Sequence, residues 1–279
     1  MKTELKQRAE QYSALSANRR NREDRNCLSW WFPRLQAAGV PVPKTVIVRT
    51  DCELVALCDG ITPDGFVEFL AELRSAADSL GSYPVFLRTG QCSGKHNWKN
   101  TCFLADPDLI ADHVYAIVEF SELCGMFGEL PHHVWAVREM LPTKPAVSLP
   151  GYGEMPLTLE IRAFIRDGKI QCLHPYWPKD AVEQGFPQKP VGGFSGGILD
   201  DHEYERVLPP DFDAMYATSS AWSPGDELAV RGLLKEVAPL LPDYWSVDLL
   251  STDRGWYVTD CALGGQSFHW PGCVAAAKR

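Results

Sequence analysis

Two acidic residues near the C-terminal end have surroundings that favour a metal site. Asp248 and Asp260 each lie inside a β-prone run of mostly apolar residues, where a buried carboxylate needs a counter-charge. A three- or five-residue loop centred on Asp253 puts both on one face of a hairpin, whereas a two-residue loop puts them on opposite faces. Mg²⁺ takes one or two protein carboxylates and leaves the rest to water and phosphates, so the pair indicates a nucleotide-bound ion. The alternative to a shared metal ion is that each acid is satisfied separately by its own neighbours.

A glycine-bearing loop between two short strands is a second candidate. Arg88 ends the first strand, and Gly90, Ser93, Gly94 and Lys95 follow. Glycines let a backbone approach a ligand, and exposed N–H groups beside a lysine cradle phosphate. The loop is not a P-loop because neither Ser nor Thr follows Lys95. A plain hairpin turn is the competing interpretation.

A third candidate is a pair of charged residues on one strand. Glu160 and Arg162 are two residues apart and therefore share a face. If Asp167-Gly168 forms a two-residue turn, Arg162 lies opposite Leu173 on the next strand. An arginine fixed there can hold a phosphoryl oxygen by bidentate hydrogen bonds, or it can simply pair with neighbours on a solvated face.

The elements that must position these side chains alternate between helices and hairpins. The first 25 residues are polar and favour a helix, and residues 178–225, rich in glycine and proline, favour a long loop or lid. Helices are expected at 64–80, capped by Asp64, at 107–123 and at 224–241; strands are expected at 45–49, 84–88, 101–104, 134–141, 157–166, 169–174, 244–250 and 256–262. This mixture predicts an α+β fold with at least two lobes.

Composition narrows the class of protein. The 279 residues are 45% hydrophobic with a net charge of −9, which suits a globular protein and disfavours a sequence-independent grip on nucleic acid. The basic stretch 18–25 contains acidic residues and favours a solvated helix end. We find no secretory signal and no membrane span. The nine cysteines show no CxxC and no Cys-His cluster at zinc spacing, so reduced thiols in a cytoplasmic protein are expected.

Taken in order, these segments over roughly residues 40–270 resemble the ATP-grasp superfamily, particularly its compact members related to the eukaryotic cell-division-cycle proteins and to short ligase-like proteins of phages and bacteria. The resemblance implies two α+β lobes that grip a nucleotide, preceded by a short helical segment. It divides the chain into an N-terminal helical and strand-helix segment (1–80), a small lobe with phosphate loop and hinge (81–141), and a C-terminal lobe with lid and metal site (142–279).

The resemblance also implies ATP and Mg²⁺ as cofactors and a role for each candidate residue. The implied roles are phosphate binding for Arg88, Gly90, Ser93, Gly94 and Lys95; adenine binding by backbone groups near Glu139 and Leu141; nucleotide contact for Glu160; the transferred phosphoryl group for Arg162, with Lys95 also catalytic; and Mg²⁺ for Asp248 and Asp260. The family commonly has Asn two residues after its last acidic ligand, where this chain has Ala262, which puts a second magnesium site in doubt. Gln266 is a candidate substitute.

The implied activity is a Mg²⁺- and ATP-dependent carboxylate–amine or carboxylate–thiol ligase that works through an acyl phosphate. Its acceptor is a small molecule, peptide or protein with a carboxylate, and His174, Trp177 and Lys179 are candidates for the acceptor side. The alternative is an ATP-binding assembly factor for a protein partner without ligase turnover. Ala262 and the aromatic segment Trp30-Trp31-Phe32, as a docking surface, favour that alternative.

Overall fold

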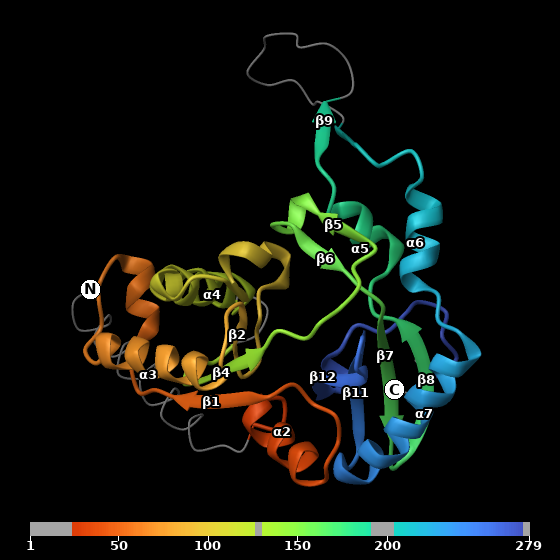
Figure 1. The fold of residues 1–279 in the computed structure, drawn as a ribbon, viewed down its shortest axis with the longest axis horizontal. Helices are drawn as coiled ribbons and strands as arrows, with labels where there is room; N and C mark the ends of the chain where they lie inside the picture. Colours follow the sequence, from red (N-terminus) through yellow and green to blue (C-terminus); the bar gives the residue numbers. More distant parts are fainter. Residues whose placement is uncertain (1–23, 126–129, 191–203, 276–279) are drawn as a thin grey trace, which may run out of the picture.

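Two lobes lie side by side in the computed structural model, each built on a four-stranded antiparallel sheet (Figure 1). The structure describes residues 24–125, 130–190 and 204–275. The predicted N-terminal helix and most of the basic stretch therefore lie outside the described residues. The predicted α+β fold with two lobes is confirmed.

The first lobe carries a sheet in the order β1-β4-β2-β3 with helices packed against one face. Its elements are β1 (Thr45–Arg49), η1 (Leu54–Asp59), α3 (Phe66–Ser79), β2 (Val85–Thr89), η2 (Lys95–Asn100), β3 (Phe103–Leu104), η3 (Pro107–Leu109), α4 (Ile110–Gly125) and β4 (Val134–Glu139). Because β1 pairs with β4, the boundary expected at residue 80 does not separate two units. Helix α3 begins after Gly65, which has a left-handed φ of 76°, and not at the expected Asp64 cap.

Alternation along β4 gives this sheet two different faces. Trp135 and Val137 point into the core formed with α3 and α4. Ala136 packs into the core of the second lobe, and Arg138, two residues further on, lies on that same face. One face of the sheet thus stabilises the first lobe, and the other faces the second lobe.

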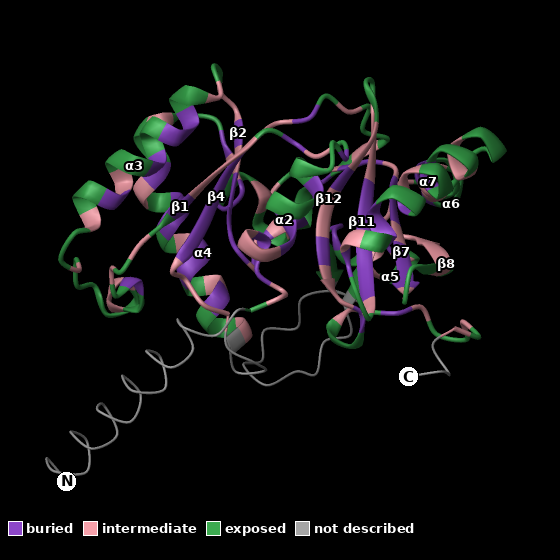
Figure 2. Ribbon diagram, turned by 90° about the horizontal axis from the view of Figure 1, so that it is seen from below, coloured by how far each residue is buried: buried purple, intermediate pink, exposed green. Residues whose placement is uncertain are grey.

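The second lobe carries a sheet in the order β12-β11-β7-β8. Its elements are β7 (Glu160–Arg166), β8 (Lys169–Pro175), α7 (Pro224–Val237), η5 (Ala238–Leu240), β11 (Tyr244–Thr252), β12 (Gly255–Leu263) and η6 (Gly264–Gln266). Helix α7 starts with a capping box in which Ser223 and Asp226 satisfy each other's backbone N–H groups. Figure 2 shows that buried positions concentrate on the strands, whereas α3 and α7 keep an exposed outer side.

Both hairpins of this sheet contain an extra residue that changes the register expected from sequence. The Asp167-Gly168 turn is the predicted two-residue turn, but the pairing shifts after Ile165 so that Arg162 lies opposite His174 and not Leu173. In the last hairpin, Thr252 pairs with Gly255, so the turn has two residues. A single extra residue, or β-bulge, displaces all later pairs by one position.

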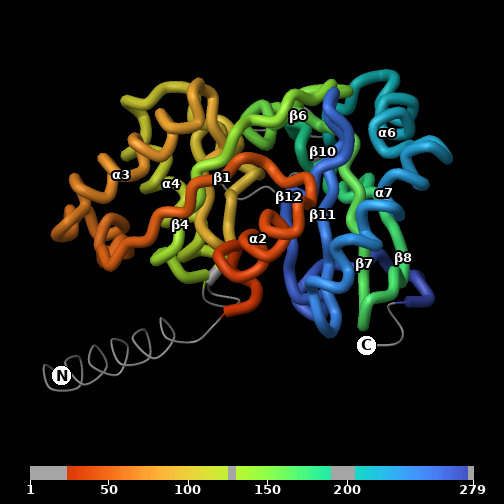
Figure 3. The backbone as a smooth tube through the Cα atoms, turned by 60° about the horizontal axis from the view of Figure 1, so that its bottom comes forward, coloured from red at the N-terminus to blue at the C-terminus, as the bar shows by residue number. Residues whose placement is uncertain are grey.

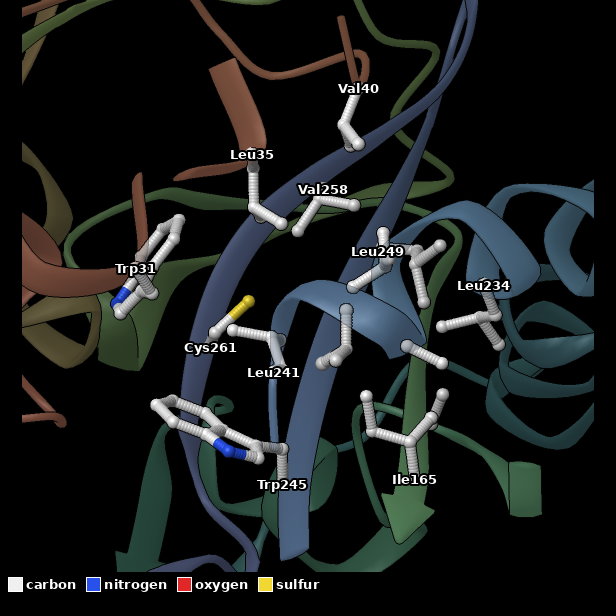
Figure 4. Close-up of a cluster of buried hydrophobic side chains, with 14 of the residues drawn as sticks. Trp31, Leu35, Val40, Ile165, Leu234, Leu241, Trp245, Leu249, Val258 and Cys261 are labelled. Atoms are coloured by element: carbon white, nitrogen blue, oxygen red, sulfur yellow. The ribbon is translucent and has the colours of Figure 1, made fainter. Parts of the chain in front are cut away.

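The aromatic segment Trp30-Trp31-Phe32 is part of the core and not a docking surface. It belongs to α2 (Leu28–Ala37), which packs against β11 and β12 of the second lobe (Figure 4). Trp31 is 0% and Phe32 2% exposed, and the Trp30 ring stacks on Trp245 with centroids 5.3 Å apart. The prediction of an exposed docking surface was wrong because the residues that cover this segment come more than 200 positions later in the chain. Asn26, just before α2, likewise bonds to Leu263, 237 residues later.

A third group of short elements lies at one end of the second lobe (Figure 1). It consists of β5 (Val147–Leu149), η4 (Pro150–Tyr152), β6 (Met155–Leu157), α5 (Lys179–Gln184), β9 (Gln188–Pro190), β10 (Tyr204–Arg206) and α6 (Phe212–Ser220), around its own small core. The loop expected over 178–225 is therefore largely structured where it is described. Residues 191–203 of that expected lid lie outside the described residues. Within the described chain, no helix has the length and apolar content to cross a membrane.

Candidate functional site

A cavity of about 460 Å³ opens between the two sheets. Its apolar walls include Pro43, Phe86, Trp98, Phe103, Met140 and Leu141, and its charged lining comprises Arg88, Lys95, Lys99, Arg138, Glu139, Glu154, Glu160 and Asp260. Three aromatic rings form one continuous wall, since the Trp98 centroid lies 5.8 Å from Phe86 and 5.6 Å from Phe103. A cavity with one apolar wall and several convergent charges suits an amphipathic ligand.

Arg88 and Asp260 connect the two lobes across this cavity. Arg88 follows Phe86 by two residues on β2 and so faces the same side. Its Nη1 lies 3.1 Å from Asp260 Oδ2 on β12; Arg88 is buried, and the Asp260 side chain is 38% exposed. Burial favours the neutral form, but the Asp260 carboxylate outweighs it and raises the pKa of Arg88. Arg88 therefore stays protonated.

Lys95 and Glu160 form a second ion pair between the lobes. Lys95 Nζ lies 3.1 Å from Glu160 Oε1, and Trp177 Nε1 donates to Glu160 Oε2 at 3.1 Å. Burial lowers the pKa of Lys95, but Glu160 and the nearby Tyr176 and Asp248 raise it overall. Lys95 Nζ also lies 4.7 Å from the centroid of the Tyr176 ring. Lys95 thus stays protonated where it lines the cavity.

Arg138 is the cation that sequence reasoning missed. It is 3% exposed; its Nε donates to Thr45 Oγ1 at 3.1 Å, and its Nη1 donates to the carbonyl oxygen of Thr259 at 2.6 Å. Its Nη2 is buried without a hydrogen-bond partner, and no ion pair of the described residues includes it. Burial and the neighbouring Arg88 lower the pKa of Arg138 to about 9. A buried guanidinium with an unpaired nitrogen at a cavity is suited to an anionic ligand.

Arg162 is held by Asp248. Its Nε and Nη2 lie 2.7 and 2.8 Å from Asp248 Oδ1 and Oδ2, in a bidentate pair that is mostly buried. Burial opposes the charge of Arg162, but the Asp248 carboxylate raises the pKa of Arg162 overall. Neither residue lines the cavity, although Asp248 lies directly opposite Asp260, which does. The counter-charge predicted for these two acids is supplied here by Arg162 and Arg88.

The segment connecting the lobes lines the apolar part of the cavity. The N–H group of Glu139 is already used, because it donates to the carbonyl oxygen of Lys44 at 2.9 Å. The Glu139 carboxylate accepts from the N–H of Lys44 and lies 3.0 Å from Arg254 Nη2. Leu141 is buried at the cavity, and its backbone makes no hydrogen bond to any described residue. Of the two residues predicted near an adenine, Leu141 therefore has the free peptide group.

Several predicted site residues lie elsewhere. Gly90, Ser93 and Gly94 do not line the cavity. A Cβ on Gly90 would lie 2.3 Å from Cys27 Sγ, so this glycine permits close packing against the N-terminal segment. Gly94 has a left-handed φ of 63° and accepts a hydrogen bond from Thr101 at 2.8 Å, which shapes the turn before η2.

The remaining candidates divide between the cavity and the surface. Gln266 is exposed and accepts a hydrogen bond from Asn26, so it does not replace a ligand at Ala262. Of the three residues expected on the acceptor side, Trp177 lines the cavity. Lys179 pairs with Asp213 on the surface at 2.6 Å. His174 lies in a separate cluster of cysteines and histidines.

The sequence does not indicate Arg138 as a site residue, because a lone arginine in an apolar strand has no characteristic spacing.

No protein-family model matches this sequence, and neither does any curated protein. Solved structures with a similar fold include Cdc123 from Schizosaccharomyces pombe, with 14% identity, coverage of 86% of this chain and 83% of that chain, and a TM-score of 0.49. They also include a RimK domain protein ATP-grasp from Sphaerobacter thermophilus, with 14% identity, coverage of 86% and 59%, and a TM-score of 0.43.

A third similar structure is the D-alanine–D-alanine ligase from Bacillus anthracis, with 13% identity, coverage of 90% of this chain and 61% of that chain, and a TM-score of 0.43. The chain thus spans about three fifths of the ligase and of the RimK domain protein. At such identities and TM-scores, these similarities assign no family and no activity to this chain.

Proposed function

We propose that this protein binds ATP in the cavity between its lobes and uses it to activate a carboxylate. The observation that carries the proposal is Arg138, a buried guanidinium with an unpaired Nη2 at the cavity. Arg88 adds a second positive charge and Lys95 a third, both also lining the cavity. Three cations that converge in a protein of net charge −9 favour a polyanion such as a triphosphate.

The charge balance supports phosphates over a simple cation. At this end of the cavity Arg88 pairs with Asp260 and Arg162 with Asp248, whereas Arg138 forms no ion pair with any described residue and keeps one Nη without a partner. The aromatic wall and the segment ending at Leu141 offer an apolar surface with a free peptide group, which suits a purine base. Base and phosphates would then lie along one cavity.

Magnesium fits this site through Asp260. That carboxylate is partly exposed at the cavity, where its Oδ1 accepts from the N–H of Cys261 and its Oδ2 pairs with Arg88. Asp248 is more buried, and Arg162 engages both of its oxygens. One protein carboxylate together with phosphate oxygens and water is a common magnesium environment. A bound magnesium ion would supply neutralisation of phosphate charge. The protein's part is to orient the phosphates with Arg88, Lys95 and Arg138 and to keep the reacting groups out of bulk water.

The chemistry proposed is transfer of the terminal phosphoryl group to a carboxylate, followed by attack of an amine or thiol on the acyl phosphate with release of phosphate. Positioning and charge neutralisation supply most of the catalysis in such phosphoryl transfers. The acceptor is a carboxylate-bearing small molecule, peptide or protein. Arg162 does not line the cavity and pairs with Asp248, so we assign it a positioning role through Asp248.

Calorimetry on the folded protein tests the binding step. We expect a non-hydrolysable ATP analogue with Mg²⁺ to bind more tightly than AMP or tripolyphosphate, because the analogue alone uses both the apolar wall and the cations. Equal affinity of AMP and the analogue would show that the cations do not bind the phosphates. Absence of heat with all three would overturn the ATP-binding proposal.

A second candidate function is an ATP-binding assembly factor without turnover. The absence of a ligand side chain at Ala262 favours it, whereas the burial of Trp31 and Phe32 removes the docking surface that also spoke for it. Conversion of ATP to ADP that depends on added acid distinguishes the two. Pools of amino acids and peptides are suitable substrates, and ATP binding without any conversion across the pools would favour the assembly factor.

A further inference from the structure

Two cysteines and two histidines gather at the end of the second sheet, away from the cavity between the lobes. Cys172 and His174 lie on β8, and His269 and Cys273 lie in the segment that follows η6. One ligand atom from each residue, a sulfur or an imidazole nitrogen, lies within 4.8 Å of all the others. The sequence shows no Cys-His cluster at zinc spacing, but the fold brings these four residues together.

The spacing of these four atoms suits a tetrahedral ion. A zinc ion bound at roughly 2.3 Å to sulfur and roughly 2.0 Å to nitrogen holds its ligand atoms roughly 3.3 to 3.8 Å apart. Cys172 Sγ and His269 Nε2 already lie 3.1 Å apart, and the largest separation allowed by the cluster is 4.8 Å. Small side-chain rotations therefore suffice to bring all four atoms onto one ion.

His174 gives an independent indication of a missing partner. Its Nε2 is buried and has no hydrogen-bond partner. A buried imidazole nitrogen without a partner is unfavourable unless something outside the protein satisfies it. A metal ion at the centre of the cluster would do so.

The surroundings orient the ligands as in protein metal sites. The Tyr244 hydroxyl lies 3.4 Å from His269 Nδ1 and can fix the tautomer in which Nε2, 3.1 Å from Cys172 Sγ, carries the lone pair. The Phe164 ring stacks on His269 at a centroid distance of 3.9 Å, and Trp270 stacks on His174 at 6.0 Å. The aromatic rings thus limit the rotation of both imidazoles.

We propose that Cys172, His174, His269 and Cys273 bind one structural zinc ion that fastens the C-terminal segment to strand β8. Two thiolates and two imidazoles select zinc over magnesium or calcium, which prefer oxygen ligands. Four protein ligands fill a tetrahedral site and leave no position for a substrate, so the ion is structural and not catalytic. Binding releases the two thiol protons to solvent.

The position of the cluster explains what the zinc ion stabilises. Strand β8 is the edge of the sheet, and the dark-blue segment after β12 reaches it in Figure 3. Beyond η6 the described part of this segment has no helix or strand of its own. Trp270 Nε1 donates to the carbonyl oxygen of Pro175 at 3.0 Å, which already places the segment against β8. The ion adds a cross-link between parts of the chain 97 residues apart.

Metal analysis of the full chain, purified under reducing conditions with zinc, tests this proposal. We expect about one zinc per chain, and loss of that zinc in Cys172→Ser and Cys273→Ser. Cys58→Ser is the matched control, because Cys58 is exposed and outside the cluster; it should keep the metal. A chelator should lower the Tm of the wild type by at least about 5 °C and leave the Tm of Cys172→Ser unchanged.

A spectroscopic measurement covers the case in which the variants fail to fold. Co²⁺ added to metal-free wild-type protein should give the intense visible absorption of tetrahedral cobalt with thiolate ligands, and zinc should abolish it. A folded wild type without zinc and without this cobalt spectrum would overturn the proposal. So would a Cys172–Cys273 disulfide, identified by peptide mapping of the protein purified under reducing conditions. Equal zinc content in all variants would likewise exclude this cluster.

Discussion

Asp248 and Asp260 lie directly opposite each other on β11 and β12, and a β-bulge at Thr259 puts them there. With the two-residue turn alone, Asp248 would face Thr259, and Asp260 would point to the other side of the sheet. The bulge adds one residue to β12 and returns Asp260 to the face that carries Asp248. The carbonyl oxygen of Thr259 also accepts a hydrogen bond from Arg138. This one β-bulge thus brings Asp248, Asp260 and Arg138 together.

Arg162→Ala should destabilise the fold. The substitution leaves Asp248 buried without its counter-charge, and removal of one partner of a buried ion pair typically costs about 3–5 kcal/mol. Urea unfolding monitored by circular dichroism measures the change. The double variant Arg162→Met with Asp248→Leu should recover most of the loss, because it removes both charges. A single variant as stable as the wild type would show that Asp248 does not depend on Arg162.

Lys95→Gln should weaken ATP binding by about 10- to 100-fold, since a hydrogen bond to a charged group contributes about 1.5–3 kcal/mol. Gln keeps a donor toward Glu160 and so limits the loss of stability. Lys235→Gln on the exposed side of α7 removes the same charge far from the cavity and is the control. Titration calorimetry gives both affinities. Equal weakening in the two variants would indicate a general charge effect and not a phosphate contact.

Gly90→Ala should destabilise the protein by about 1–3 kcal/mol without changing its affinity for ATP, because the added methyl group overlaps Cys27 Sγ. Replacing Cys27 by Ala in the same chain removes that sulfur and should restore much of the stability. Thermal unfolding and calorimetry on the single and double variants separate packing from binding. A selective loss of ATP affinity in Gly90→Ala would return this glycine to the phosphate loop.

Stability should fall as the pH falls from about 6.5 toward 4, in part because of His132. Burial and the nearby His133 lower the pKa of His132 from 6.5 to about 4, so the unfolded chain binds the proton more readily across that window. The contribution is fully present above pH 6.5 and is lost progressively below it, to a limit of about 3 kcal/mol.

Glu122, 3.6 Å from His132 Nε2, would gain an ion pair on protonation and reduce this loss. His132→Gln cannot titrate and should show a flatter dependence of Tm on pH over the same window. Scans of both proteins between pH 4 and pH 7 compare the slopes. Parallel curves would mean that another group governs the acid sensitivity.

The elements were predictable where local chemistry decides them. The Asp167-Gly168 turn was identified because both residues suit positive φ, and they have φ values of 49° and 76°. The apolar spacing after Asp106-Pro107 located α4, whose preceding turn Asp106 caps. The cavity brings together four of the charged residues singled out in the sequence, namely Arg88, Lys95, Glu160 and Asp260, and their roles stay predictions.

Features that depend on distant contacts could not be predicted. A bulge at Thr259 has no signature in a β-prone run, so the route by which Asp260 meets Asp248 was not foreseen. The cluster of Cys172 and His269 joins positions 97 residues apart and therefore shows no compact zinc spacing. Arg138 looks like any strand residue until its neighbours are known. The burial of the aromatic residues of α2 likewise depends on residues far along the chain, so the sequence did not predict it.

The packing of α2 has a consequence for the newly made chain. Asn26 accepts a hydrogen bond from the N–H group of Leu263, 237 residues later, and Arg25 pairs with Asp243. The aromatic side of α2 is synthesised before β11 and β12, the strands that cover it, which follow more than 200 residues later. At typical elongation rates the delay is on the order of tens of seconds. During that interval Trp31 and Phe32 are open to chaperones and to other nascent chains, so the yield of folded protein depends on protection of α2.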